Sequence, residues 1–221
     1  MRLFAFCLAL FLCVTPAFAE DKPVIYRQGT AKNKIALTFD DGPHERYTEE
    51  ILSVLSEFGV KATFFVIGEN AEARPDLLLK VKEGGHEIGN HTYSHVFLRD
   101  LSLAATCKEV TRASDAIEKI TGTRPRLFRP PGGSYSDAKL GVITEMGYVS
   151  VLWSKDTRDW TSPSVESVVA AAVDSPASGD IILFHDFVGK NSPTPAALKK
   201  IIPALQNRGF EFVTVSEILC L

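Results

Sequence analysis

The feature that most constrains this chain is a regular alternation of short apolar runs, rich in β-branched residues, with longer amphipathic stretches. Runs of the first kind are typical of buried strands. Stretches with apolar residues every three or four positions are typical of helices. Strands that are joined through helices run parallel, because the helix carries the chain back to the end of the sheet where the previous strand began. The pattern therefore predicts an α/β fold with a mostly parallel sheet.

The alternation predicts seven strands separated by six helices. The strands are expected at Ile35–Phe39, Ala62–Ile67, Glu87–Asn90, Leu127–Arg129, Val149–Trp153, Asp180–Phe184 and Glu211–Val215. The helices are expected at Tyr47–Phe58, Asp76–Glu83, Leu101–Thr121, Asp137–Met146, Ser164–Val173 and Pro195–Asn207. Seven parallel strands wound in one direction can close into a barrel, but an open doubly wound sheet has the same periodicity. The periodicity alone leaves both architectures open.

The first 19 residues have the composition of a secretory signal peptide. Arg2 supplies a positive charge, an apolar run extends from Leu3 to Val14, and small residues lead to Ala19. The run is shorter than the ~20 apolar residues that a membrane span requires, and the A-x-A ending is typical of a cleavage site. We expect cleavage after Ala19, a single domain over residues 20–221, and a secreted or periplasmic protein with no membrane anchor.

Charge and cysteine content narrow the class of protein further. The net charge is −3, and the basic residues form no stripe, so the sequence gives no indication of nucleic-acid binding. Nothing in it indicates a protein partner. After cleavage only Cys107 and Cys220 remain. They belong to elements that are expected to lie far apart, whereas bridged cysteines need Cα atoms within roughly 7 Å. We therefore expect no disulfide.

Aspartate, histidine and arginine residues gather where the predicted strands end. Asp40 and Asp41 follow the first strand and are stopped by Gly42-Pro43. His91, Arg129 and His185 stand at the ends of later strands. The carboxyl ends of parallel barrel strands form the mouth where active sites lie. We expect these polar side chains to meet there.

Within this group the spacing of two histidines indicates a metal site. His91 and His95 are four residues apart, so a helical turn would place both imidazoles on one face. Two histidines with a carboxylate are a common ligand set for Zn²⁺ or a related divalent ion, and Asp41 is the natural third ligand. The histidine pair alone is a weak signal. The Asp40-Asp41 pair at another strand end favours the metal site and leaves Asp40 free as a base.

Five ordered motifs resemble those of the family 4 carbohydrate esterases, the polysaccharide deacetylases. The motifs are Thr38-Phe39-Asp40-Asp41-Gly42, His91-Thr92-Tyr93-Ser94-His95, Arg129-Pro130-Pro131-Gly132, Asp156-Thr157-Arg158-Asp159-Trp160 and Leu183-Phe184-His185. The resemblance spans roughly residues 34 to 219. It implies a distorted (β/α)7 barrel and so favours the barrel over the open sheet.

The resemblance also implies a role for each polar residue. Asp41, His91 and His95 would bind one divalent metal, usually zinc. Asp40 would be the general base, held ionised by Arg129. His185 would be the general acid, with Asp159 accepting from its other ring nitrogen and favouring the protonated form.

A second set of residues would bind the substrate. Trp160 and Leu183 would form the apolar wall for the acetyl methyl group, although Trp160 could equally be core. Pro131 and Gly132 would lie at the oxyanion. Many relatives have Tyr after Arg-Pro-Pro, where this chain has Gly132, so a backbone donor is kept and an aromatic contact is lost. Tyr135 or Tyr93 could supply a sugar-stacking face instead.

The expected function is metal-dependent removal of N-acetyl groups from a polysaccharide or oligosaccharide that contains N-acetylglucosamine, such as peptidoglycan or chitin, with release of acetate. An O-acetyl polysaccharide esterase would use the same residues. A non-catalytic carbohydrate-binding protein is disfavoured, because Asp40 and His185 are both present. A hydrolase of small cyclic amides should show rearranged metal or base motifs, and none is seen.

Overall fold

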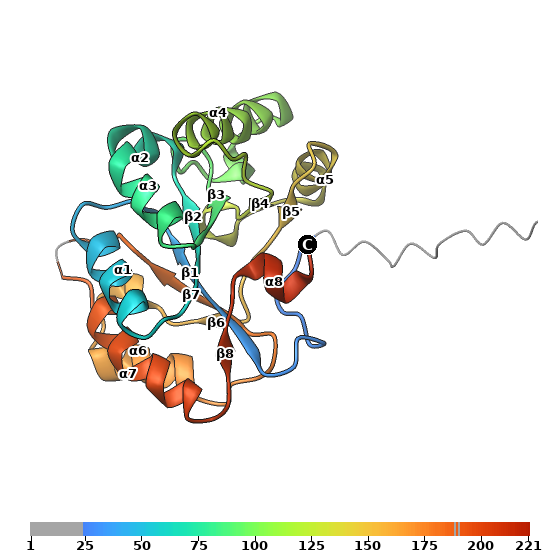
Figure 1. Cartoon of the computed structure of the whole chain (residues 1–221). Helices are drawn as coiled ribbons and strands as arrows, with labels where there is room; N and C mark the ends of the chain where they lie inside the picture. The colour runs from blue at the N-terminus through green and yellow to red at the C-terminus, as the bar shows by residue number, and fades with distance from the viewer. Residues whose placement is uncertain (1–23, 188, 190) are drawn as a thin grey trace, which may run out of the picture.

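The computed structural model describes residues 24–187, 189 and 191–221, so the expected signal peptide at residues 1–19 lies outside it. The described residues form an eight-stranded sheet whose strand pairs all run parallel (Figure 1). The strands are β1 Lys34–Asp40, β2 Thr63–Val66, β3 Glu87–Asn90, β4 Leu127–Phe128, β5 Val149–Ser150, β6 Lys155–Asp156, β7 Ile181–His185 and β8 Glu211–Phe212.

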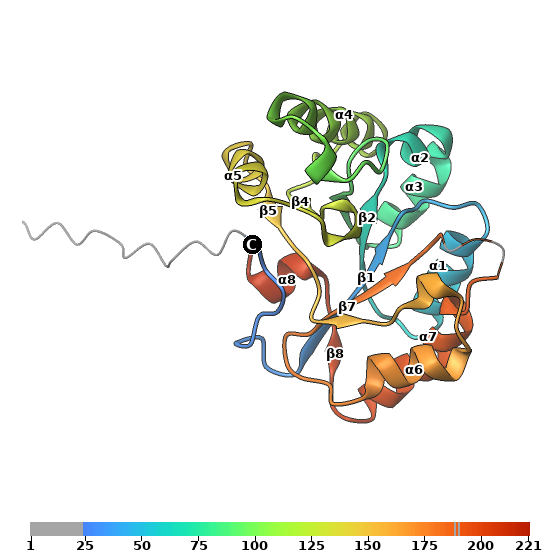
Figure 2. The same ribbon diagram turned by 180° about the vertical axis from the view of Figure 1, so that it is seen from behind.

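Helices flank the sheet. They are α1 Tyr47–Glu57, α2 Gly68–Ala73, α3 Pro75–Glu83, α4 Leu103–Thr121, α5 Asp137–Glu145, α6 Val165–Val173, α7 Thr194–Gln206 and α8 Val215–Leu219, with 3₁₀ turns η1 Leu98–Asp100, η2 Pro131–Gly133 and η3 Asp159–Thr161. In both views α1, α6 and α7 lie together on one side, and α2 to α5 lie on the other (Figures 1 and 2). Among the described residues, no helix combines the length and the apolar character that crossing a bilayer requires.

The strand order confirms the barrel and excludes the doubly wound sheet. The observed order is β5-β4-β3-β2-β1-β7-β6. Strands that are consecutive in the chain are therefore neighbours around a ring, with β7 next to β1, and the ring stays open between β5 and β6. The segment from Val24 to Arg27 spans this opening: Ile25 pairs with Val151 beyond β5, and Arg27 pairs with Asp180 before β7. The architecture is therefore the predicted distorted barrel, with one seam.

Side chains on the two faces of the strands pack into different layers, because successive residues of a strand point to opposite sides. Leu37 and Phe39 face outward and pack with residues of α1 and α7. Ala36 and Phe65 belong to a separate buried cluster with Val215 and Ile218 of α8. The chain after β8 thus packs against the strand residues near the start of β1, at the opposite end from Asp40.

Two expected strands end three residues earlier than predicted. The run Val149–Trp153 is a strand only to Ser150, since the chain then crosses the seam: Val151 N–H still donates to Phe128, but Ser154 N–H already donates to Ile181 of β7. The run Glu211–Val215 stops at Phe212, because Thr214 caps α8 and exchanges hydrogen bonds with Glu217. Helices α2 and α8 and strand β6 were not predicted, so the sheet has eight strands where seven were expected.

Cys107 lies in α4 and Cys220 directly follows α8. Both are free.

Candidate metal centre and active site

The carboxyl ends of β1, β3, β4 and β7 bring the predicted polar residues to one mouth of the barrel. They line a cavity of about 420 Å³. Its lining residues are Asp40, Asp41, His91, His95, Phe97, Gly132, Trp153, Asp156, Trp160, Leu183 and His185. The structure brings Asp40 and His185 together with the three metal candidates, whereas Arg129 and Asp159 are buried and do not line the cavity.

A sharp turn after β1 sends Asp40 and Asp41 into the same cavity. Asp41 has φ of 79°, and the peptide between Gly42 and Pro43 is cis. A Cβ on Gly42 would stand 1.9 Å from the carboxylate of Asp186, so a side chain at this position would displace that carboxylate. Asp186 in turn accepts from the Thr48 hydroxyl at 2.6 Å, and its backbone N–H donates to the Asp40 carbonyl. The support from Asp186 and Thr48 was not foreseen in the sequence.

The expected helical turn from His91 to His95 is wrong. The segment is a loop in which Thr92 and His95 have φ of 66° and 57°. Two neighbouring groups hold it: Asn90 accepts from Thr92 N–H, and Glu109 of α4 accepts from the N–H groups of Tyr93 and Ser94. The carbonyls of Thr92 and Tyr93 accept the first N–H groups of α2. This loop, rather than the expected helical turn, therefore places the imidazoles of His91 and His95 beside each other.

The three expected ligand residues fit a divalent metal. Asp41 Oδ1 lies 3.4 Å from His91 Nε2 and 3.1 Å from His95 Nε2. Two ligands ~2.1 Å from a tetrahedral ion lie about 3.4 Å apart, so these separations suit one ion. Asp41 Oδ1 is buried and accepts no well-aligned hydrogen bond, although both imidazoles face it.

The surroundings of His91 and Asp41 favour the binding of a cation. His91 Nδ1 donates to the Arg129 carbonyl at 2.7 Å, which leaves the Nε2 lone pair free to bind metal. Burial by itself raises the pKa of Asp41, but the facing imidazoles of His91 and His95 outweigh burial and hold that pKa well below its usual range. The carboxylate is therefore ionised at neutral pH. Asp41, His91 and His95 form a divalent-metal site.

Asp40 stands beside the metal ligands and is fixed by a fully buried arginine. Arg129 Nη1 donates to Asp40 Oδ1 at 2.7 Å and to the Thr38 hydroxyl at 2.8 Å. The other guanidinium nitrogens donate to the carbonyls of Val151 and Leu152, so the arginine cannot turn away. The second oxygen of Asp40 lies 3.8 Å from His91 Nε2. Asp40 is thus oriented without being one of the three ligands that surround the metal position.

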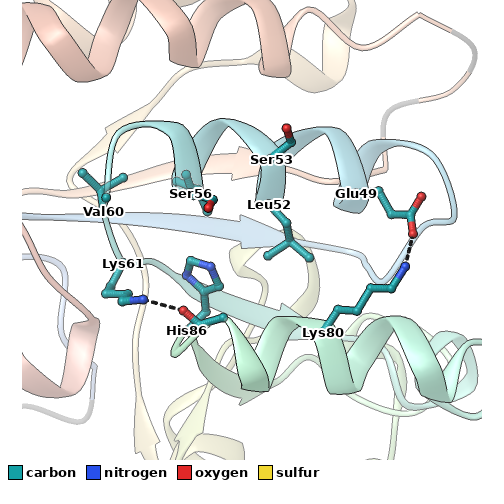
Figure 3. Close-up of a pocket in the computed structure, with 11 residues that line it drawn as sticks. Glu49, Leu52, Ser53, Ser56, Val60, Lys61, Lys80 and His86 are labelled. Carbon is teal, nitrogen blue, oxygen red and sulfur yellow. Dashed lines mark hydrogen bonds and ion pairs between the residues drawn. The ribbon is translucent and has the colours of Figure 1, made fainter.

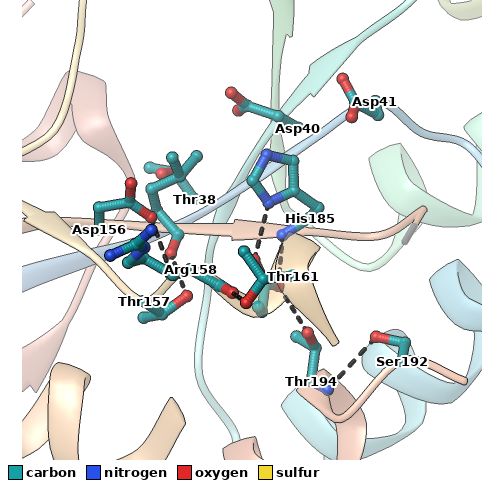
Figure 4. A network of polar contacts seen from close by, with 12 residues as sticks. Thr38, Asp40, Asp41, Asp156, Thr157, Arg158, Thr161, His185, Ser192 and Thr194 are labelled. Atoms are coloured by element: carbon teal, nitrogen blue, oxygen red, sulfur yellow. Dashed lines mark hydrogen bonds and ion pairs between the residues drawn. The ribbon is translucent and has the colours of Figure 1, made fainter. Parts of the chain in front are cut away.

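His185 enters the cavity from β7 and is held by Asp159 of η3. Asp159 Oδ1 accepts from His185 Nδ1 at 2.7 Å, while its Oδ2 accepts from the His185 backbone N–H and from the Thr194 hydroxyl. Figure 4 shows the His185 ring between the pair Asp40 and Asp41 and the side chain of Thr194. Burial lowers the pKa of His185, but the hydrogen bond and charge of Asp159 outweigh it and raise the pKa to about 9.

The expected substrate residues divide into two groups. Trp160 is 52% exposed and lines the cavity with buried Leu183, so the core interpretation of Trp160 is wrong. Gly132 also lines the cavity, next to buried Pro131. Tyr135 is not among the lining residues: it packs beside the α4–α5 cluster, and its hydroxyl hydrogen-bonds Tyr26.

Another hollow of about 450 Å³ lies between α1 and α3 (Figure 3). Its ionisable side chains have local partners: Lys80 pairs with Glu49, and Lys61 donates to the Gly84 carbonyl. Burial lowers the pKa of His86 to about 4, so that imidazole is neutral. None of the three metal-ligand residues lines this hollow, and the chemistry belongs to the barrel mouth.

A parallel barrel with an Asp-His-His metal site, an arginine-held carboxylate and a carboxylate-held histidine defines a metal-dependent hydrolase. Residues 27–151 match the family model described as polysaccharide deacetylase. The chain is 45% identical over 187 residues to a peptidoglycan-N-acetylglucosamine deacetylase of Bacillus cereus, covering 84% of this chain and 87% of that one. It is 39% identical to a chitooligosaccharide deacetylase of Sinorhizobium fredii, covering 83% and 91%.

A solved structure of a peptidoglycan N-acetylglucosamine deacetylase superposes with a TM-score of 0.86 at 34% identity, covering 89% of this chain and 92% of that one. The chain belongs to the polysaccharide deacetylase family.

Proposed function

We propose that this protein removes N-acetyl groups from N-acetylglucosamine units of peptidoglycan or of chitin-like oligosaccharides, releasing acetate and a free amine. The observation that carries the proposal is the convergence of Asp40, His185 and the three-residue metal site on one cavity. The names of the relatives support the same substrate class.

The proposed first step is attack of water on the acetamide carbon. A divalent metal held by Asp41, His91 and His95 would act as a Lewis acid toward the acetamide oxygen and would lower the pKa of water. Asp40 takes the proton from the attacking water. Its bond from Arg129 keeps one oxygen occupied, so the other is directed at the metal position. The backbone N–H of Gly132 stabilises the developing oxyanion.

The proposed second step is protonation of the leaving nitrogen by His185. An amine is a poor leaving group without a proton, and a group with a pKa near 9 still carries one at neutral pH. Asp159 fixes the proton on Nδ1, so Nε2 is the atom that faces the cavity and donates. Leu183 and Trp160 form the apolar wall that receives the acetyl methyl group.

A polymeric substrate agrees with the exposed aromatic residues at the mouth. Phe97 and Trp160 both line the cavity and are about half exposed. Exposed apolar groups that gather round one cavity mark a ligand-binding surface. A glycan chain longer than the cavity would contact them.

Zinc is the proposed native metal, because two imidazoles and one carboxylate are typical zinc ligands in hydrolases. Metal analysis of protein purified without chelators tests this choice. Secretion or periplasmic location is proposed from the first 19 residues alone. Fractionation of cells that produce the full chain, with determination of the mature N-terminus, tests it.

The experiment that tests the function is an acetate-release assay on metal-loaded protein with three substrates: peptidoglycan, chitooligosaccharides and acetylated xylan. We expect release from at least one N-acetylated glycan, and the amine that appears should equal the acetate. Release from acetylated xylan alone would replace the proposal with the O-acetyl esterase. Binding of glycans without release from any substrate would identify a carbohydrate-binding protein.

A further inference from the structure

Phe97 is an exposed aromatic residue beside the metal centre that the reaction itself does not use. It lines the cavity, and its ring centroid lies 6.2 Å from that of His95. Nearly half of the residue is accessible to solvent. A large apolar ring that is exposed to water at the mouth of a cavity is typical of a ligand-binding site, because a bound ligand removes the ring from water.

The backbone that follows Phe97 is held in place. The next residue, Leu98, is fully buried in the cluster formed with α4 and α5. Arg99 then donates from Nε to the Ser134 hydroxyl at 2.6 Å, which ties η1 to the turn at η2. The ring is therefore presented from an anchored segment, and a ligand would lose little free energy in ordering it.

Gly132 makes the space into which Phe97 fits. A Cβ on Gly132 would lie 2.6 Å from Cε1 of Phe97, closer than such atoms approach in proteins. Gly132 also has φ of 59°, a conformation that other residues adopt at a cost. The ring of Phe97 therefore occupies the position that a side chain at residue 132 would take.

We propose that Phe97 is the stacking platform for the sugar unit next to the one that is deacetylated, and that Gly132 is required to keep the platform in place. This inference rests on the proposed function and names the subsite on the His95 side of the cavity. The C–H face of a pyranose is apolar and flat enough to cover an aromatic ring. Phe97 would then select chains of several sugars over a single one.

A simpler role for the ring would be to shield His95 from water. The two roles predict different results for Phe97→Leu. Leucine keeps an apolar group beside His95, so shielding would survive, but it has no flat face on which a sugar could stack.

Binding should be measured by calorimetry on metal-loaded Asp40→Asn protein, which should bind the chitin tetramer and deacetylate it far more slowly than the wild type. Adding Phe97→Ala or Phe97→Leu should weaken tetramer affinity by about tenfold, as expected for one aromatic stacking contact, whereas Phe97→Tyr should not. Metal content should stay at the parent value in all three. Leu103→Ala is the matched control, since Leu103 is equally exposed but does not line the cavity.

Gly132→Ala tests the second half of the inference. It should weaken tetramer binding as Phe97→Ala does, and the double variant should be no weaker than either single one, because both remove the same platform. Unchanged affinity in Phe97→Ala, full affinity in Phe97→Leu, or additive losses in the double variant would overturn the inference. Acetate release by the wild type is measured separately, so failure of the deacetylase assignment is a distinct result.

Discussion

At the scale of single residues, the two adjacent aspartates have different partners. Asp40 is bonded to Arg129, whereas Asp41 faces two imidazoles. The same side-chain type is thereby given two chemical environments, one suited to a base and one to a metal ligand. The difference arises because the backbone turns at Asp41, which has a positive φ, so that the two side chains meet different partners. The residue types alone do not distinguish the two roles.

The first prediction separates the two aspartates. Asp40→Asn keeps the shape but removes the charge, so we expect turnover to fall by about 10²–10⁴-fold while metal stays bound. Asp41→Asn should lose metal as well as turnover. Metal analysis and kcat on the two variants check this. Metal loss in Asp40→Asn, with metal kept in Asp41→Asn, would show that the roles are exchanged.

The second prediction concerns the proton on His185. Its pKa is raised to about 9 through Asp159, so activity that needs this proton is expected to fall as pH rises through about 9. Asp159→Asn removes the charge that stabilises the imidazolium, so the alkaline limb of kcat/KM should move to lower pH. An unmoved limb would leave Asp159 with a structural role only.

The same shift has a consequence for stability. A histidine whose pKa is raised on folding stabilises the native state fully below its unfolded value of ~6.5, and that contribution is lost as pH rises through about 9. Asp159→Asn should therefore destabilise the protein at neutral pH more than at pH 10. Urea unfolding at both values measures the difference.

At the scale of elements, the sequence predicted those with strong periodicity and missed those set by tertiary contacts. β1, β3 and α4 were found nearly to the residue. The end of β5 at Ser150 was missed because Val151 and Leu152 are as apolar as strand residues. Only the hydrogen-bond partners of this segment show that the chain passes there from one edge of the sheet to the other. Helix α8 had a readable signal, the pair Thr214 and Glu217 at capping-box spacing.

The third prediction concerns that helix. Ile218 is buried with Ala36 and Phe65, near the start of β1. Ile218→Ala should lower the free energy of unfolding by about 2–4 kcal/mol, because it leaves a cavity that α8 cannot close. The control Leu221→Ala, at an exposed position, should change it by under about 0.5 kcal/mol. Urea denaturation compares them. Equal values would show that α8 adds nothing to the core.

At the scale of the whole molecule, the candidate site was more predictable than its scaffold. Strand ends in a parallel barrel share one mouth, so Asp40, Asp41, His91 and His185 could be grouped from order alone. The residues that hold them were not predictable in this way. Glu109, Thr194 and Asp186 act through contacts with segments distant in sequence, and nothing in their local sequence distinguishes them from ordinary polar residues.

The fourth prediction concerns the metal and the stability of the whole barrel. A bound ion would join Asp41, after β1, to the histidines after β3, and anything that binds only the native state stabilises it. At a hundred times its Kd the gain is about 2.7 kcal/mol, or roughly 5–10 °C in Tm for a domain of this size. Chelation should therefore lower Tm in the wild type. His91→Ala should melt at the same temperature with and without chelator.

The seam between β5 and β6 has a consequence for how the native protein opens. Besides the covalent crossing of the chain between Ser150 and Lys155, the described residues bridge the seam through the short segment from Ile25 to Arg27, which forms isolated bridges rather than a ladder. Amide protons there are protected by few neighbouring bonds, whereas those of β1 lie between strands on both edges. In heavy water the amides of Ile25 and Leu152 should therefore exchange well before those of Leu37 and Phe39, with the barrel unzipping from its seam while the metal side stays closed.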